Sequence, residues 1–246
     1  MKHYRWEIRL GLSLIVLSAL LYFIHYLIFR DVTHIFLWVL TSIAFLPISV
    51  LFVTLIVNRL LINREKNARL EKLNMVIGAF FSEVGTRLLV YFSDFDPKLG
   101  KIRGHLVVTN DWDEEEFLSI SQRLRHFDYS IDIERLDLEV LRNLLVDKRE
   151  FLLRLLENPA LLEHETFTKL LRSVFHLTEE LANRKDLGRL PDTDYEHLAT
   201  DIKRAYILLV YEWLNYMKYL KNNYPFLFSL AMRTNPFDLS ASPEVR

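Results

Sequence analysis

The fold is decided by two stretches that contain no charged residue: LGLSLIVLSALLYFIHYLIF at residues 10–29 and VTHIFLWVLTSIAFLPISVLFVTLIV at residues 32–57. A helix rises about 1.5 Å per residue, so the first stretch reaches about 30 Å, the hydrocarbon thickness of a bilayer. Only two residues separate the stretches. The sequence therefore predicts an antiparallel transmembrane hairpin over residues 1–58, with helices at about 8–29 and 33–57. A cleaved signal sequence is disfavoured, because the first run is too long for a signal core.

Positive charge around the hairpin predicts its orientation. Lys2, Arg5 and Arg9 precede the first span, five basic residues lie within Arg59–Lys72, and the connecting turn offers only Arg30. By the positive-inside rule, both termini are expected to be cytoplasmic. The basic excess beside the second span also predicts that anionic lipid headgroups are a partner there.

Small and polar residues recur on one face of each predicted span. If the turn is centred between residues 30 and 31, Ser18 lies opposite Ser42 and Gly11 lies opposite Ser49 at equal depth. Small residues at matched depth allow helices in lipid to approach closely. His25 continues the stripe near the end of its span, where we interpret it as an interfacial or packing residue, with a functional role as the alternative.

Beyond the hairpin, the pattern predicts a coiled-coil-like juxtamembrane helix over residues 59–93. Apolar residues with alternating spacings of three and four form a seam on it. A second stripe, Gly78, Ser82 and Gly85, leaves room for another backbone to come close. We favour packing within the chain for this helix, and a homo-oligomeric interface is the alternative. The seam consists of Leu70, Leu73, Ile77, Phe80, Val84, Leu88 and Tyr91.

Residues 94–246 are predicted to form an all-α cytoplasmic domain. Residues 105–109 are the only candidate strand, and we interpret them as an extended connector. The acidic run at residues 113–116 fits the first turn of a helix capped by Asn110 or Asp111. Further helices are expected at about 137–157, 164–185, 193–221 and 225–234.

The composition excludes several kinds of chemistry. The chain has no cysteine, so it has no disulfide, thiolate zinc site or cysteine nucleophile. Neither a glycine-rich phosphate loop nor a Gly-x-Ser-x-Gly elbow is present. Residues 59–246 carry 27 Lys and Arg against 30 Asp and Glu, which gives nucleic acid no electrostatic footprint. No catalytic residue and no cofactor is therefore predicted.

One set of side chains has the spacing of a metal site. His176 and Glu180 form an i, i+4 pair on one predicted helix, and His197 and Asp201 form another on the next, at similar height about the intervening turn. At 100° per residue, however, His176 lies about 180° from the expected buried stripe, and Glu180 and His197 lie about 140° from theirs. We therefore expect both pairs to be solvated and predict no metal site.

Three stretches resemble a family of uncharacterised prokaryotic membrane proteins. They are His34–Leu60 with its AFLPI centre, Glu71–Leu88 reading EKLNMVIGAFFSEVGTRL, and Tyr224–Asp238 ending in RTNPFD. The resemblance covers most of the chain. It implies two transmembrane helices, a helical cytoplasmic domain and a multi-pass location in a prokaryotic inner membrane, but it carries no activity and no functional residue.

The leading functional hypothesis is a non-enzymatic, membrane-anchored module whose helical domain binds a second copy or an unidentified membrane or cytoplasmic protein. One alternative is a subunit of an oligomeric channel or small transporter, whose pore only Ser, Thr, Tyr and His side chains could line. A membrane-bound metal-dependent enzyme that uses the two histidine–carboxylate pairs is the least favoured alternative.

Overall fold

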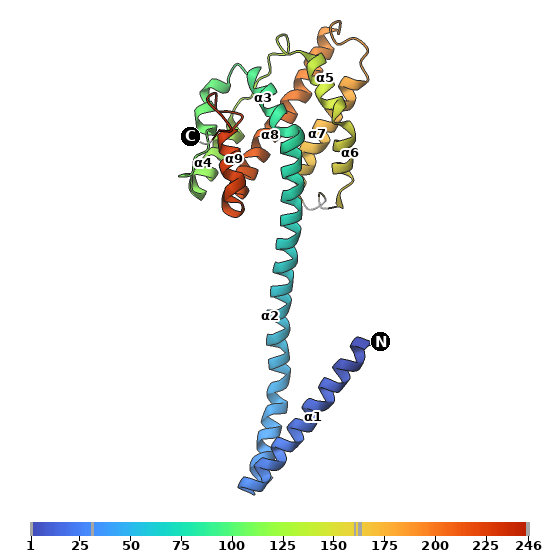
Figure 1. Ribbon diagram of the computed structural model, residues 1–246, viewed down its shortest axis with the longest axis vertical. Coiled ribbons are helices and arrows are strands. Elements are labelled where there is room, and N and C mark those ends of the chain that lie inside the picture. The colour runs from blue at the N-terminus through green and yellow to red at the C-terminus, as the bar shows by residue number, and fades with distance from the viewer. Residues whose placement is uncertain (1, 31, 160, 162–163, 245–246) are drawn as a thin grey trace. The chain divides into compact units, whose positions relative to one another are not determined.

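The computed structural model describes residues 2–30, 32–159, 161 and 164–244. It divides into two compact units, Met1–Lys66 and Asn67–Arg246. The described residues are arranged in helices, turns and loops and contain no strand (Figure 1). The all-α fold class predicted from the sequence is therefore confirmed.

The first unit is built from two long helices. Helix α1 spans Lys2–Phe29, and helix α2 spans Val32–Phe80, so that the chain passes from the first unit into the second within α2. Arg30 has a φ of 47°, in the left-handed region, and its N–H donates to the Tyr26 carbonyl at 2.9 Å. This arrangement is a frequent way to end a helix. The other turn residue, Asp31, lies outside the described residues.

Both helices are long and apolar enough to cross a membrane by length and composition. The segments are Arg9–Ile28, with a mean hydropathy of 2.1, and the apolar part of Val32–Asp94, with 2.5. None of the residues in either apolar window is buried. Ile15, for example, is 68% exposed and Ile62 is 61% exposed. The chain itself therefore leaves a long apolar surface uncovered, unlike the core helix of a soluble domain.

A π-helical turn interrupts the long helix predicted for residues 59–93. Helix α2 ends at Phe80, the π turn η1 spans Phe81–Gly85, and α3 spans Thr86–Asp94. A π turn holds an extra residue, so it rotates the residues that follow about the helix axis. In α3 the side chains of Leu88, Leu89 and Phe92 are buried, whereas Tyr91, which the predicted seam includes, is only half-buried.

Residues 105–109, the candidate strand that we interpreted as a connector, form no strand, and one predicted cap is wrong. Residues 105 and 106 belong to the short 3₁₀ turn η3, Arg103–Leu106, which follows a similar turn η2, Leu99–Lys101. Helix α4, Glu114–His126, begins later than expected, because Asp113 is its N-cap and accepts the Glu116 N–H at 2.8 Å. The acidic run supplies both the cap and the first turn, where carboxylates favour the helix dipole.

The remaining helices lie close to their predicted ranges, with one break. The helix expected at 137–157 is divided at Lys148 into α5, Leu138–Asp147, and α6, Arg149–Leu156. Helix α8 contacts α3, α4, α7 and α9, while α7 also packs against α5 and α6 (Figure 1). The last three helices are α7, Glu165–Ala182; α8, Asp192–Asn223; and α9, Pro225–Arg233.

The predicted seam packs within its own domain. Phe80 is fully buried, and its ring meets that of Phe167 on α7 edge to face at 5.5 Å. Phe92 meets Tyr206 on α8 in the same manner at 6.0 Å. Only Leu70, at the start of the seam, is exposed, at 41%. The apolar residues that suggested a coiled coil thus belong to the core of the second unit.

The segment after α9 is fixed to the core through Asn235. Its side-chain amide donates to the Leu106 carbonyl at 2.8 Å, and its Oδ1 accepts the Phe237 N–H at 2.9 Å. The Phe237 ring is buried edge to face against Trp213 at 4.9 Å. The Asn235 side chain therefore joins the segment after α9 to η3, and the Phe237 ring joins the same segment to the central helix α8.

Candidate functional site

The residues predicted to pack the two spans together meet at one end of the hairpin only. The His25 ring stacks on that of His34, with 6.1 Å between centroids and 11° between planes. At Gly11 a Cβ atom would have no heavy atom within 4 Å, so the expected close approach to Ser49 is not made there. The Ser49 hydroxyl donates to the Phe45 carbonyl of its own helix at 3.1 Å. The side chains of Ser18 and Ser42 are exposed.

The stripe of Gly78, Ser82 and Gly85 in the second unit does not lie against one neighbouring helix along its whole length. A Cβ at Gly78 would lie 2.7 Å from the Tyr216 hydroxyl oxygen, so α8 occupies the space that glycine leaves. A Cβ at Gly85 would lie 2.6 Å from a ring carbon of Phe81 in the same π turn. Ser82 is exposed. At Gly78 the close approach therefore occurs within the chain.

The structure brings His176, Glu180, His197 and Asp201 together. Helices α7 and α8 are joined by residues 183–191 and run antiparallel, so His176 faces Asp201 and Glu180 faces His197 at equal height. The His176 Nε2 lies 3.2 Å from the Asp201 Oδ2 and 3.7 Å from the Glu180 Oε1. The His197 Nε2 lies 3.4 Å from the same Asp201 oxygen and 3.7 Å from the Glu180 Oε2. We call these four residues the histidine–carboxylate cluster.

The cluster is partly open to solvent, but one of its members is buried. The imidazoles of His176 and His197 are 47% and 49% exposed, whereas the Asp201 side chain is only 3% exposed. The two histidines are exposed, as expected, but the expectation of two separate, solvated pairs is wrong for Asp201, which is buried where the pairs meet. That expectation considered only the angle between each side chain and the buried stripe of its own helix. Two antiparallel helices also face each other along their flanks, and these residues meet there.

Two arginines hold the carboxylates of the cluster. The Arg184 guanidinium donates to Glu180 at 2.7 Å and to Asp194 through two hydrogen bonds of 2.6 and 2.8 Å. Its hydrogen bond lowers the pKa of Glu180 despite partial burial, and likewise lowers the pKa of Asp194. Arg204 donates to the Asp201 Oδ1 at 3.0 Å. Glu180 is therefore ionised at neutral pH, and each cluster carboxylate has one oxygen bound by an arginine.

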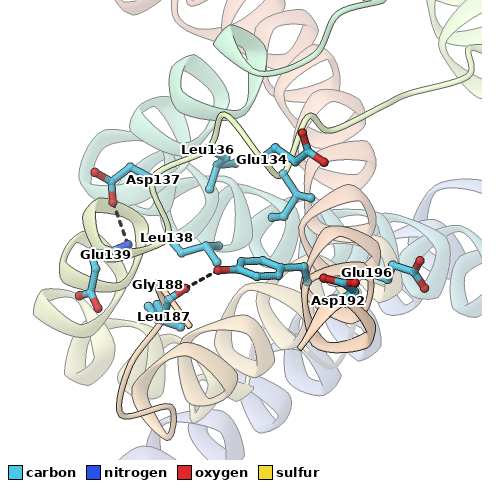
Figure 2. A pocket seen from close by; sticks show the side chains of 11 residues that line it. Glu134, Leu136, Asp137, Leu138, Glu139, Leu187, Gly188, Asp192 and Glu196 are labelled. Atoms are coloured by element: carbon cyan, nitrogen blue, oxygen red, sulfur yellow. Dashed lines mark hydrogen bonds between the residues drawn. The ribbon is translucent and has the colours of Figure 1, made fainter. Parts of the chain in front are cut away.

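A cavity of about 700 Å³ lies where α5 and α8 begin. Figure 2 shows Asp137 and Glu139 at one side, Asp192 and Glu196 at the other, and Leu136 and Leu138 between them. The Asp137 Oδ1 caps α5 by accepting the Glu139 N–H at 3.0 Å. Sequence reasoning missed this cavity because three separate segments line it. The only signal was the density of acidic residues at two helix starts, which dipole stabilisation already explains.

The comparisons with known proteins agree on one family. The model of the C-terminal helical domain of uncharacterized protein MJ1433 matches residues 69–233, and that of its N-terminal helical domain matches residues 1–61. Uncharacterized protein MJ1433 of Methanocaldococcus jannaschii is 49% identical over 234 residues, which cover 95% of this chain and 94% of the relative. No solved structure matches. The resemblance to an uncharacterised family is thus confirmed, and the chain belongs to the family of MJ1433, with both helical domains in the same order.

Proposed function

We propose that the protein is an integral membrane protein that spans a prokaryotic inner membrane as a hairpin of α1 and the first part of α2. In this proposal the helical domain of residues 67–246 is held at the cytoplasmic face, where it binds a second copy or another membrane or cytoplasmic protein. The name of the related protein gives neither a cellular location nor a biochemical role, and the proposal supplies both.

The exposure of the apolar side chains between Leu10 and Ile62 carries the proposal. The chain covers none of the residues in the two apolar windows, so in water they would remain hydrated. Removing apolar surface from water contributes about 25 cal/mol per Å². Helices also satisfy their own backbone hydrogen bonds, which hydrocarbon requires. A bilayer is the environment that meets both conditions along 20 or more residues.

The charges beside the spans support the orientation. Basic residues lie on both outer flanks, and the turn holds only Arg30 with Asp31, which supports a cytoplasmic location for both termini. Arg59–Lys72 then lies at the cytoplasmic headgroups, where anionic lipid attracts it. The hydroxyls of Thr41 and Ser49 donate to carbonyls of their own helix, and no observation favours the channel alternative over the anchor.

The structure changes where the proposed interaction surface can be. The seam at Leu70–Tyr91 suggested self-association, but Leu73–Leu88 of this seam packs into the domain. The space beside Gly78 is filled by the Tyr216 hydroxyl of the same chain. Self-association or partner binding must therefore use other surfaces of the domain.

The absence of cysteine makes topology directly measurable. A single cysteine is introduced at Arg30 in the turn or at Ser240 near the C-terminus, and intact cells are treated with a membrane-impermeant maleimide. We expect Arg30→Cys to react in intact cells and Ser240→Cys to react only after lysis, while the cysteine-free parent stays unlabelled. Labelling of Ser240→Cys in intact cells contradicts the orientation, and release of the protein by alkaline carbonate contradicts the anchor.

The interaction role has its own test. Amine-reactive crosslinking in native membranes, followed by detergent purification, is expected to return a dimer or higher species or a reproducible second protein. Recovery of monomer alone, with no co-purifying protein, refutes the interaction role and leaves the membrane anchor in place.

A further inference from the structure

The facing flanks of α7 and α8 carry a row of charged and polar side chains. In this row, Arg184 and Asp194 form an ion pair with two hydrogen bonds. The histidine–carboxylate cluster lies next to this pair, and in it two imidazoles face two carboxylates. Among the described residues, three carboxylates here, those of Glu180, Asp194 and Asp201, pair with two guanidiniums, those of Arg184 and Arg204. The two imidazole Nε2 atoms lie between the carboxylates of Glu180 and Asp201, so the cluster offers ligand atoms from four side chains.

We propose that His176, His197 and Asp201, together with Glu180, bind one divalent transition-metal ion between α7 and α8. The proposal concerns the second unit alone and does not depend on the membrane anchor.

The distances are compatible with ligand atoms around one metal ion. The Asp201 Oδ2 lies 3.2 Å from the His176 Nε2 and 3.4 Å from the His197 Nε2. On the Glu180 side, Oε1 lies 3.7 Å from the His176 Nε2 and Oε2 lies 3.7 Å from the His197 Nε2. Zinc bonds to nitrogen and oxygen are about 2.0–2.2 Å, so neighbouring ligands of a tetrahedral site lie about 3.3–3.6 Å apart. His176, Glu180 and His197 can also each offer one ligand atom such that all three lie within 4.8 Å of one another. Asp201 lies outside this set of three and approaches it through the two Nε2 atoms, so one ion bound by all four residues requires the side chains to move toward tetrahedral spacing.

The buried carboxylate of Asp201 is an independent observation that points to a cation. Its Oδ2 is buried and accepts no hydrogen bond from the residues that the structure describes, although it is the oxygen that both imidazoles face. A buried carboxylate oxygen without a donor is costly, and buried polar atoms are almost always satisfied. A metal ion bound between this oxygen and the two Nε2 atoms would satisfy it.

Arg204 and Arg184 act as outer partners of the proposed site. Arg204 binds the Oδ1 of Asp201 and leaves the Oδ2 toward the imidazoles. Arg184 binds the Oε2 of Glu180 and leaves the Oε1 toward His176. Partners of this kind fix the orientation of metal-ligating carboxylates, and their loss costs about tenfold to a hundredfold in metal affinity.

The ligand types indicate which ions can bind. Two imidazoles with carboxylates suit Zn²⁺, Co²⁺, Ni²⁺ and Fe²⁺, whereas Mg²⁺ and Ca²⁺ prefer sites made of oxygen alone. The half-exposed imidazoles let an ion enter from solvent. The site is therefore expected to exchange its metal and to reject Mg²⁺.

The test uses the full chain in detergent micelles, purified through a tag without histidine and stripped with a chelator. Co²⁺ is titrated in, because four-coordinate Co²⁺ has a strong visible absorption. We expect one Co²⁺ per chain, displacement by equimolar Zn²⁺, and no displacement by a large excess of Mg²⁺. Absence of the absorption, or equal competition by Mg²⁺, overturns the proposal.

Substitutions locate the site. His176→Ala and His197→Ala are each expected to weaken Co²⁺ binding more than a hundredfold, and Arg204→Ala by about tenfold to a hundredfold. His126→Ala, which removes another exposed histidine on α4, serves as the matched control and is expected to bind as the native chain does. Because His176 and His197 are half-exposed, their variants should retain the native circular dichroism spectrum. Native affinity in either variant refutes the assignment.

Discussion

Gly78→Ala is expected to have different effects on stability in two backgrounds, because one hydroxyl oxygen occupies the space that the new methyl group needs. A Cβ at position 78 would lie 2.7 Å from the Tyr216 Oη and 3.4 Å from its Cζ. The first distance is well inside van der Waals contact, and the second is an ordinary contact. Tyr216→Phe therefore removes the clash and leaves the rest of the packing in place.

The magnitudes follow from two opposing terms. Alanine stabilises a helix interior by about 1 kcal/mol relative to glycine. Overpacking at a site that cannot relax costs about 1–3 kcal/mol. The Tyr216 ring is held by stacking on Phe81, with 5.5 Å between centroids, so we expect it to resist displacement. In the native background the change should be neutral or destabilising by up to about 2 kcal/mol; in Tyr216→Phe it should stabilise by about 1 kcal/mol.

The assay is a double-mutant cycle read by thermal unfolding in detergent micelles. For a unit of this size, 1 kcal/mol corresponds to about 2–4 °C. We expect a coupling energy of at least about 1 kcal/mol between the two positions. Equal effects of Gly78→Ala in both backgrounds would refute the reasoning. A shift that grows with protein concentration would instead place Gly78 at an interface between chains.

Three further predictions concern buried groups of the second unit. Leu88→Ala should destabilise by about 2–5 kcal/mol and Leu70→Ala by less than about 1 kcal/mol in urea unfolding, because only Leu88 is fully buried; equal effects would show that the seam packs elsewhere. Asn235→Ala should destabilise by about 2–4 kcal/mol, because it leaves the Leu106 carbonyl and the Phe237 N–H without their partner; native stability would contradict the bridging role. Burial raises the pKa of Glu212, although a hydrogen bond from Thr166 and the charge of His164 lower it, so the folded state favours the neutral acid. The stability that this group contributes is therefore lost as the pH rises from the pKa of the unfolded chain, 4.5, through the higher pKa of the folded protein. Glu212→Gln should therefore match the native unfolding temperature near pH 4 and exceed it near pH 8, and an equal difference at both pH values would contradict this assignment.

Several features of the chain followed from local sequence alone. The charge-free runs at residues 10–29 and 32–57 are helical, and the spacing of apolar residues placed α7, α8 and α9 close to their observed ranges. These signals are local, because helix periodicity, charge in a first turn and proline after a helix act within a few residues. Errors at this level were small, such as the cap at Asp113 and the break at Lys148.

What a helix faces was decided by tertiary structure. The seam of the 59–93 segment could serve a second chain or its own domain equally well, and only the positions of Phe167 and Tyr206 assign it to the domain. The π turn at Phe81–Gly85 then rotates the seam, and no local pattern indicated it.

The histidine–carboxylate cluster shows the same division most clearly. The sequence supplied the four residues and their i, i+4 spacing, and it placed them at similar height. It could not supply the rotation of α7 against α8, because that rotation is fixed by core side chains distant in sequence and by the loop at residues 183–191. Reasoning about one helix at a time therefore separated His176 from Asp201, whereas the packed hairpin holds their nitrogen and oxygen 3.2 Å apart.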